Sequence, residues 1–193
     1  FYKKDDYFYA ICGDATGHGV ISGIMVSVTK AGLHGIPMSD PSSILGKLNR
    51  IVKRVNFGRL RMSLSVAKFN EKSVELSSAA MPPTYFFSSK SKILEEVLVP
   101  NLPLGGIETE KFDGVKKEFS SGDVMVMISD GLPELPNPAN ELLDYEKVET
   151  CIRNNSEKSA DEIKDALVYL CDQWANGVMN PDDITIVVIK KAA

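Results

Sequence analysis

The sequence predicts an α+β fold in which two antiparallel sheets are flanked by helices. Helical periodicity occurs near the start and the end of the chain, whereas short apolar runs separated by turn residues fill the middle. Two antiparallel sheets with helices outside them would bury this many apolar strands. The chain has 193 residues, of which 44% are hydrophobic and 25% charged, so we expect one globular domain over residues 1–193.

The first part of the chain predicts one strand and then a helix. Residues 7–13 are rich in aromatic and apolar side chains and are expected to form a buried strand. A tight turn rich in glycine follows over residues 14–19 and leads into a buried helix over residues 20–33. The segment 35–41, which contains two prolines, ends that helix.

A second helix is expected to begin at Pro41 or Ser42, with Asp40 or Ser42 as its N-cap. Its apolar side chains recur at helical spacing and therefore share one face. This face comprises Ile44, Leu45, Leu48, Ile51 and Val52.

From Leu60 onward the pattern changes to that of strands, and residues 70–72 and 88–91 serve as hairpin turns. The expected strands are residues 60–69, 73–79, 84–89, 92–99, 115–119 and 123–129. Two helices and a final strand close the chain, and the second of these helices carries Ser159 as N-cap with Glu162 as its capping-box partner. These last elements are predicted at residues 141–153, 159–176 and 184–190.

Aspartates lie at the ends of three apolar runs. Asp14 and Asp130 each follow such a run, and Asp182 and Asp183 precede one. Clustered carboxylates repel one another unless a proton or a cation lies between them. Oxygen ligands without cysteine or histidine suit Mg²⁺ or Mn²⁺ rather than zinc. The sequence therefore predicts a divalent-metal site that serves hydrolysis at phosphorus.

Each motif taken singly has a simpler interpretation. Asp14 or Thr16 is a candidate cap of the following helix, and Asp130 followed by Gly131 is an ordinary turn signal. Residues 17–22 also approximate a glycine-rich dinucleotide loop. Asp14 would repel a pyrophosphate, however, and the expected second strand ending in an acid is missing. Three acidic motifs in one domain favour the metal site.

Composition excludes several classes of protein. The net charge of -4 and the pI near 5.3 disfavour a nucleic-acid-binding protein, which needs a basic face. No apolar stretch has the roughly 18 residues of a membrane span, so we expect no direct membrane contact from this domain. The beginning of the chain does not have the pattern of a signal peptide, which favours the cytoplasm. The cysteines Cys12, Cys151 and Cys171 are scattered in apolar runs and are expected to be reduced, buried thiols.

Four segments, in this order, resemble motifs of the bacterial SpoIIE-type (RsbU-like) serine/threonine phosphatases, which belong with protein phosphatase 2C to the metal-dependent protein phosphatase superfamily. The resemblance covers nearly the whole chain, and the set of motifs is specific although each one is weak alone. It implies a central β-sandwich of two antiparallel sheets flanked by helices. The motifs are Gly13-Asp-Ala-Thr-Gly-His-Gly19, Leu102-Pro-Leu-Gly105, Ser129-Asp-Gly131 and Asp182-Asp-Ile-Thr185.

The resemblance also implies residue roles. Asp14 would bridge two Mn²⁺ or Mg²⁺ ions, and the Ala15 carbonyl would also coordinate. Asp130 and Asp182 would hold one of the metals, with Asp183 adjacent, so Asp14, Asp130 and Asp182 form the expected catalytic set. A water activated by the metals would attack phosphorus without a covalent intermediate. We further expect His18, Gly17 and Gly131 to contact the substrate or to support the metal ligands.

The implied substrate is phosphoserine or phosphothreonine on an anti-anti-sigma-type regulatory protein in a partner-switching pathway. We expect a regulatory domain upstream of Phe1. The family's first metal-linked acid would also lie just upstream of Phe1, so the chain is expected to lack the first strand of the domain. The segment 78–83 reads Ser-Ala-Ala-Met-Pro-Pro, without the Gly and His that the family commonly has there. The alternative function is that of a catalytically impaired pseudophosphatase that binds a phosphoprotein and signals by conformation.

Overall fold

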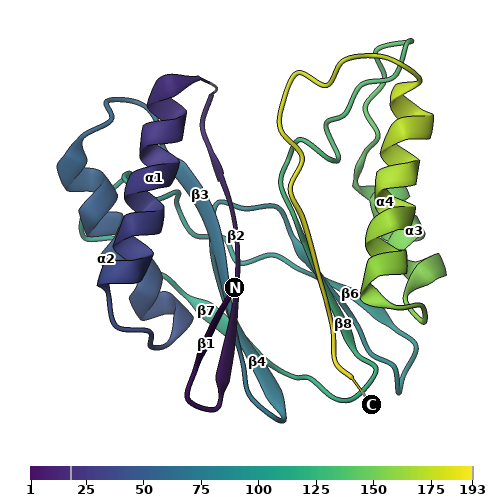
Figure 1. Ribbon diagram of the computed structural model, residues 1–193, viewed down its shortest axis with the longest axis horizontal. Coiled ribbons are helices and arrows are strands. Elements are labelled where there is room, and N and C mark those ends of the chain that lie inside the picture. The colour runs from purple at the N-terminus through teal and green to yellow at the C-terminus, as the bar shows by residue number, and fades with distance from the viewer. Residues whose placement is uncertain (18, 193) are drawn as a thin grey trace. The chain divides into compact units, whose positions relative to one another are not determined.

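The computed structural model describes residues 1–17 and 19–192. Contacts divide the chain into two compact units, which are described separately. The first contains Phe1–Met81 and Val99–Glu118, and the second contains Pro82–Leu98 and Phe119–Ala193. Each unit consists of one antiparallel sheet with two helices (Figure 1). The predicted α+β class with two antiparallel sheets and flanking helices is therefore confirmed.

The sheet of the first unit has five strands in the order β1-β2-β3-β4-β7, and each adjacent pair is antiparallel. The pairing of β2 with β3 places Asp14 opposite Ser63. The central strands β3 and β4 are largely buried, as their apolar patterns predict. The strands are β1 (Tyr2–Lys4), β2 (Tyr7–Ala15), β3 (Met62–Phe69), β4 (Ser73–Ala79) and β7 (Gly114–Glu118).

Helices α1 (Val20–Gly35) and α2 (Pro41–Val55) pack on each other and on this sheet (Figure 1). Asp40 caps α2 as predicted, because its carboxylate accepts a hydrogen bond of 2.8 Å from the Ser43 main-chain nitrogen. The predicted apolar face of α2 is the buried one, although Ile51 is only partly covered. Its residues Ile44, Leu45, Leu48 and Val52 belong to the core cluster of this unit.

The sheet of the second unit has four strands in the order β6-β5-β8-β9, again antiparallel throughout. Every residue of β8 is buried, so this strand is a core strand on both of its faces, as its continuous apolar sequence predicts. The strands are β5 (Thr84–Phe87), β6 (Leu94–Val97), β8 (Val124–Ile128) and β9 (Ile186–Lys190).

Helices α3 (Tyr145–Asn155) and α4 (Ala160–Ala175) cover this second sheet, and α4 packs against β9 (Figure 1). The predicted capping box at Ser159 and Glu162 is present at the start of α4. Lys190, at the end of β9, donates hydrogen bonds of 3.1, 2.9 and 2.6 Å to the carbonyls of Ser156, Glu157 and Lys158. Lys190 thus anchors the C-terminal end of β9 to the carbonyl groups that follow α3.

Several element boundaries differ from the predictions. Strands β3 and β9 begin two residues later than expected, at Met62 and Ile186, and β5 and β6 are shorter than the predicted ranges 84–89 and 92–99. Strand β1 was not expected, because its residues lie in a polar segment; Asp5 and Asp6 form the turn between β1 and β2. Strand β2 continues to Ala15, so Asp14 lies within a paired strand rather than in the following turn. Helix α3 begins at Tyr145 rather than at residue 141, because Asp144 is its N-cap.

The three cysteines carry free thiols; Cys12 and Cys171 are buried, and Cys151 is only partly covered. Within residues 1–17 and 19–192, the structure contains no helix with the length and apolarity that crossing a membrane requires.

Candidate metal centre

Asp14 lies near the end of β2, in the first unit, and is half-buried. Gly13, just before it, is packed so tightly that an added Cβ would lie 2.4 Å from Leu64 Cδ1 and 2.9 Å from the Ser63 carbonyl oxygen. Only glycine therefore lets β2 approach β3 this closely beside Asp14. Ala15, whose carbonyl is a predicted ligand, is buried at the end of the same strand.

The turn after β2 depends on two glycines in a left-handed conformation. Gly17 has φ 80° and Gly19 has φ 90°, values that disfavour other residue types. Thr16 holds the turn in place, because its main-chain nitrogen donates to the Arg61 carbonyl and its own carbonyl accepts from Ser22 Oγ. Gly19 is the N-cap of α1, and among the described residues no side chain forms a capping hydrogen bond with this helix, so the structure does not give Asp14 or Thr16 the capping role that was an alternative for them. His18 lies outside the described residues.

In the second unit, the structure brings Asp130 and Asp182 together. Asp130 follows β8 in a turn, and Asp182 precedes β9, which pairs with β8. A carboxylate oxygen of Asp130 and one of Asp182 lie within 4.8 Å of each other. Asp130 is half-buried and Asp182 is exposed. Asp130 and Asp182, which are 52 residues apart in the sequence, thus place their carboxylates close together.

The two acidic segments are joined by Ser129, which is fully buried. Its main-chain nitrogen donates to the Thr185 carbonyl at 3.0 Å, and its Oγ accepts from the Thr185 nitrogen at 2.9 Å. The same Oγ donates to the Asp183 carbonyl at 3.2 Å. Ser129 was not among the site residues predicted from the sequence, although its place directly before a predicted acidic ligand is a signal that could have identified it.

Asp183 takes part in this arrangement through its main chain. Its carbonyl accepts the bond from Ser129, and its nitrogen donates to Asp182 Oδ1 at 2.9 Å. The Gly131 nitrogen donates in the same way to Asp130 Oδ1 at 3.1 Å. Each carboxylate is therefore oriented by the amide that follows it.

The donor set of the second unit fits a hard divalent cation. Asp130 and Asp182 offer carboxylate oxygens, which Mg²⁺ and Mn²⁺ prefer. Two carboxylates at this separation repel each other, and a cation between them would remove that repulsion. Asp14 offers the same chemistry at the end of β2 in the first unit.

The Leu102–Gly105 motif has a structural role that the sequence did not reveal. Gly105 donates its main-chain N–H to Asn49 Oδ1 at 2.8 Å, and Asn49 Nδ2 donates to the Ile107 carbonyl at 2.8 Å. Leu104 forms an antiparallel bridge with Met62 at the start of β3. The motif therefore connects α2 with the start of β3, next to Arg61, whose carbonyl holds the turn after β2.

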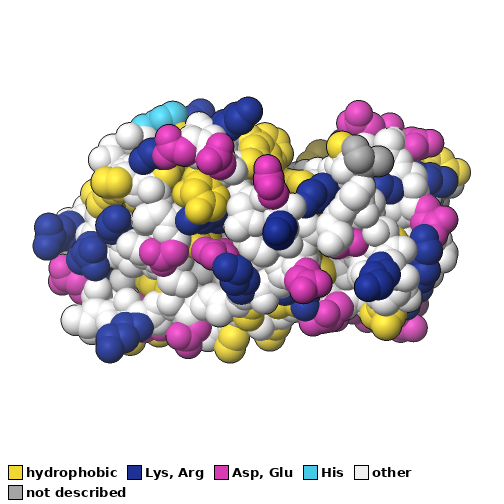
Figure 2. All heavy atoms as spheres, turned by 90° about the horizontal axis from the view of Figure 1, so that it is seen from below, with side chains coloured by type: hydrophobic (Ala, Val, Ile, Leu, Met, Phe, Trp, Pro, Cys, Tyr) yellow, Lys and Arg dark blue, Asp and Glu magenta, His cyan; other side chains and the backbone are white. Residues whose placement is uncertain are grey.

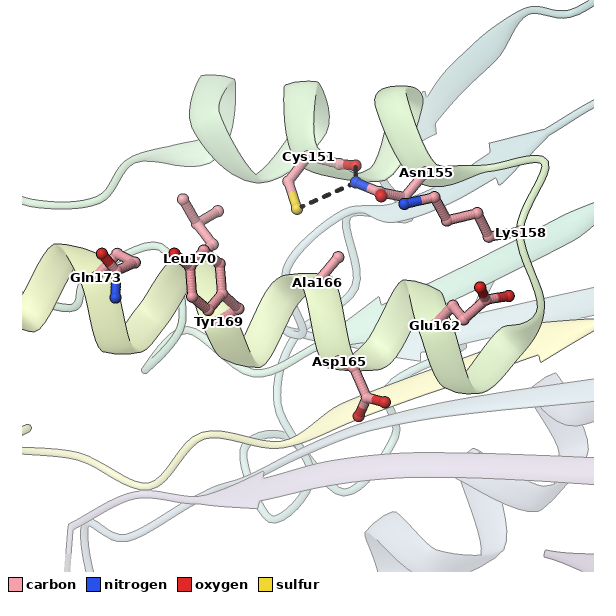
Figure 3. Close-up of a pocket in the computed structure, with 9 residues that line it drawn as sticks. All are labelled: Cys151, Asn155, Lys158, Glu162, Asp165, Ala166, Tyr169, Leu170 and Gln173. Atoms are coloured by element: carbon pink, nitrogen blue, oxygen red, sulfur yellow. Dashed lines mark hydrogen bonds between the residues drawn. The ribbon is translucent and has the colours of Figure 1, made fainter.

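A hollow of about 530 Å³ lies between α3 and α4 and contains none of the predicted site residues (Figure 3). Cys151 lines it, with Asn155 Nδ2 donating to the Cys151 carbonyl at 2.7 Å. Burial raises the pKa of the Cys151 thiol, so the sulfur is less readily ionised than an ordinary cysteine. This cysteine does not have the lowered pKa of an activated nucleophile.

Comparison with known families gives a match over almost the whole chain. The family described as stage II sporulation protein E (SpoIIE) matches residues 4–192. Among curated proteins, no sequence matches the chain.

Solved structures share the fold. The PP2C domain of SiaA from Pseudomonas aeruginosa has a TM-score of 0.83 at 15% identity, covering 96% of this chain and 80% of that chain. The RsbU and RsbW domains of Rv1364c from Mycobacterium tuberculosis give 0.78 at 19% identity, covering 97% of this chain and 54% of that one. RsbX in complex with magnesium gives 0.73 at 17% identity, covering 97% and 82%. The chain thus has a PP2C-like phosphatase fold and spans about half the length of the Rv1364c chain.

Proposed function

The chain belongs to the stage II sporulation protein E (SpoIIE) family, whose match covers residues 4–192, and we propose that it is a metal-dependent protein phosphatase. Its substrate would be phosphoserine or phosphothreonine on a regulatory protein. The observation that carries this proposal is the pair of carboxylates, Asp130 and Asp182, within 4.8 Å of each other at the ends of two paired strands. The two carboxylates repel each other, and Mn²⁺ or Mg²⁺ between them would offset that repulsion.

In this proposal Asp14 completes the ligand set, with the Ala15 carbonyl as a further donor and Asp183 adjacent to the ligands. As the resemblance to the family implies, Asp14, Asp130 and Asp182 would hold two ions of Mn²⁺ or Mg²⁺. RsbX, which shares the fold, was solved with magnesium, which supports a divalent metal here.

Bound to these carboxylates, Mn²⁺ or Mg²⁺ would supply Lewis acidity toward a phosphoryl group and toward the attacking water. The chain's own residues would position the metal ligands and the substrate. Ser129 and the amides of Gly131 and Asp183 orient the carboxylates, and the glycine turn of Gly17 and Gly19 lets the main chain lie close to a substrate. The mechanism needs no protein nucleophile. Cys12, two residues before Asp14, does not supply one, because burial raises the pKa of its thiol to about 12 and keeps it protonated.

We propose an anti-anti-sigma-type phosphoprotein as the partner, in a partner-switching pathway of the cytoplasm, with an upstream regulatory domain as input. The similarity to a chain that contains both RsbU and RsbW domains supports this assignment. A nucleic-acid partner is disfavoured by the net charge of -4. Figure 2 shows acidic and basic side chains interspersed on the face drawn, without a basic surface on that face.

The test is hydrolysis of p-nitrophenyl phosphate with and without Mn²⁺, in the chain and in the full-length protein. We expect turnover that requires Mn²⁺ and that falls at least about 100-fold in Asp130→Asn, because one ligand of the metal is lost. Asp165→Asn is the matched control, since Asp165 is an exposed aspartate of α4 paired with Lys164. The control is expected to keep wild-type turnover.

If the full-length protein shows no metal-dependent turnover, the enzymatic proposal is wrong. Binding of a phosphoprotein without turnover would then favour the alternative, a pseudophosphatase that acts as a signalling module.

A further inference from the structure

We propose that the side-chain hydroxyl of Ser129 is a positioning group that fixes the separation of the Asp130 and Asp182 carboxylates and thereby sets the affinity of the site for a divalent cation. The proposal rests on the proposed metal site and adds a residue to it. Ser129 would not touch the metal or the substrate; it would act through the two segments that carry the ligands.

The ladder between β8 and β9 ends at Ser129 and Thr185 with one of its main-chain hydrogen bonds replaced. Ile128 is paired with Ile186, and the next pair would be Ser129 with Thr185. In a hydrogen-bonded pair of an antiparallel ladder, each residue donates one main-chain hydrogen bond to the other and accepts one from it. Here only one is made, from the Ser129 nitrogen to the Thr185 carbonyl at 3.0 Å.

The hydroxyl of Ser129 replaces the missing main-chain acceptor. The Thr185 nitrogen donates to Ser129 Oγ at 2.9 Å, while the Ser129 carbonyl accepts from the Leu132 nitrogen at 3.3 Å. The carbonyl is thereby released from the sheet and begins the turn that presents Asp130. Because the hydroxyl takes over the ladder position, the chain can turn at Asp130 without leaving the nitrogen of the half-buried Thr185 unpaired.

The Ser129 hydroxyl also donates a hydrogen bond of its own. Ser129 Oγ donates to the Asp183 carbonyl at 3.2 Å, so one atom contacts two successive parts of the segment that follows Asp182. Ser129 is 0% exposed, so water has no access to its hydroxyl, and losing these hydrogen bonds would cost free energy. A side chain without a hydroxyl would leave the Thr185 amide without this acceptor and release the Asp183 carbonyl.

The experiment measures binding of Mn²⁺ alone by isothermal titration calorimetry, together with urea unfolding, for the wild type and Ser129→Ala. We expect the dissociation constant for Mn²⁺ to rise at least about tenfold in Ser129→Ala, a typical effect of losing a group that orients metal ligands. Ser129→Thr, which keeps the hydroxyl, should stay within about threefold of the wild type.

A matched control separates positioning from stability. Ser156 is also a buried serine of the second unit, and its Oγ donates to the Arg153 carbonyl at 3.0 Å. It lies by Lys190, at the opposite end of β9 from Thr185. Ser156→Ala should lose comparable stability and leave the Mn²⁺ dissociation constant within about twofold of the wild type.

Equal Mn²⁺ affinity in Ser129→Ala and the wild type would overturn the inference while leaving the proposed function intact. If the wild type itself binds Mn²⁺ no better than an Asp130→Asn, Asp182→Asn double variant, the metal site and with it the inference are wrong. Should Ser129→Ala fail to fold, Ser129→Cys serves instead, because the thiol fills similar space but is a weak hydrogen-bonding group. The same loss of affinity is expected for it, and wild-type affinity would contradict the proposal.

Discussion

Gly131 and Asp183 lie in contact that only a glycine permits: a Cβ atom at position 131 would stand 2.3 Å from the Asp183 carbonyl oxygen and 3.1 Å from its carbon. The obstacle is main chain, which cannot rotate away as a flexible side chain can. The glycine of the Ser-Asp-Gly motif is therefore required by the close approach of the two acidic segments.

Gly131→Ala is expected to destabilise the protein by about 1–3 kcal/mol, because the overlap forces a main-chain shift in a packed region. Urea unfolding measures the loss. Gly46→Ala provides the control, since Gly46 lies within α2 and a Cβ there would meet no atom within 4 Å. That change should stabilise the protein by up to about 1 kcal/mol through helix propensity. Wild-type stability of Gly131→Ala would show that the two segments can separate freely.

Asp182→Asn should separate the stability of the metal-free protein from its response to metal. Removing one of two neighbouring carboxylates relieves repulsion, but Asp182 is exposed, so the free energy of unfolding should stay within about 1 kcal/mol of the wild type. Excess Mn²⁺ should raise the melting temperature of the wild type and not that of the variant, because a bound ligand stabilises only the folded state. Asp165→Asn should keep the response. An equal Mn²⁺ response in Asp182→Asn would remove Asp182 from the ligand set.

Asn49→Ala is expected to cost about 2 kcal/mol or more of stability. Asn49 is 1% exposed, and its side chain accepts from Gly105 and donates to the Ile107 carbonyl. Truncation leaves both main-chain groups without these partners in a region with little access to water. Urea unfolding measures the total cost, and hydrogen exchange at the Gly105 amide reports whether the loss is local. Asn155→Ala, which removes a bond to the Cys151 carbonyl in a more open place, should cost less.

Alkaline pH should destabilise the protein in part through Cys171. Burial, with a smaller contribution from Asp172, raises the pKa of this thiol from 9.0 to about 11. Above pH 9 the unfolded chain ionises there while the folded chain does not, so stability is retained below pH 9 and lost as the pH rises toward 11. Each pH unit in this window removes up to about 1.4 kcal/mol.

The measurement is urea unfolding at pH 7, 9 and 10.5 for the wild type and Cys171→Ala. The variant loses some packing at every pH, so the informative quantity is the slope, which should be shallower above pH 9 than that of the wild type. Parallel slopes would mean that the Cys171 thiol ionises equally in the folded and unfolded chains.

Much of the fold could be predicted because local signals agreed with the final structure. The apolar run of β8 and the capping box of α4 needed no tertiary information. Strand β1 could not be found this way, since a three-residue polar segment becomes a strand only by pairing with β2. The start of α3 was misplaced because residues 136 and 142 pair in a short bridge ahead of Asp144.

Asp130 and Asp182, whose carboxylates the structure brings together, could be chosen as candidates from the sequence because each lies at the end of an apolar run. The partner of Asp130 within its unit could not be derived from spacing, because the antiparallel pairing of β8 with β9 brings Asp182 to it across 52 residues. The role of Ser129 was also hidden, since its hydroxyl acts on residues that adjoin it only in the folded chain.

Lys190 has a consequence for the acidic pair at the other end of its strand. Its ammonium group binds three carbonyls beyond α3, while Thr185 is held by Ser129. Sliding β9 by even two residues would break both attachments together, so alternative registers are excluded from either end. Removing the ammonium group of Lys190 is therefore expected to weaken the register of β9 without removing a candidate metal ligand.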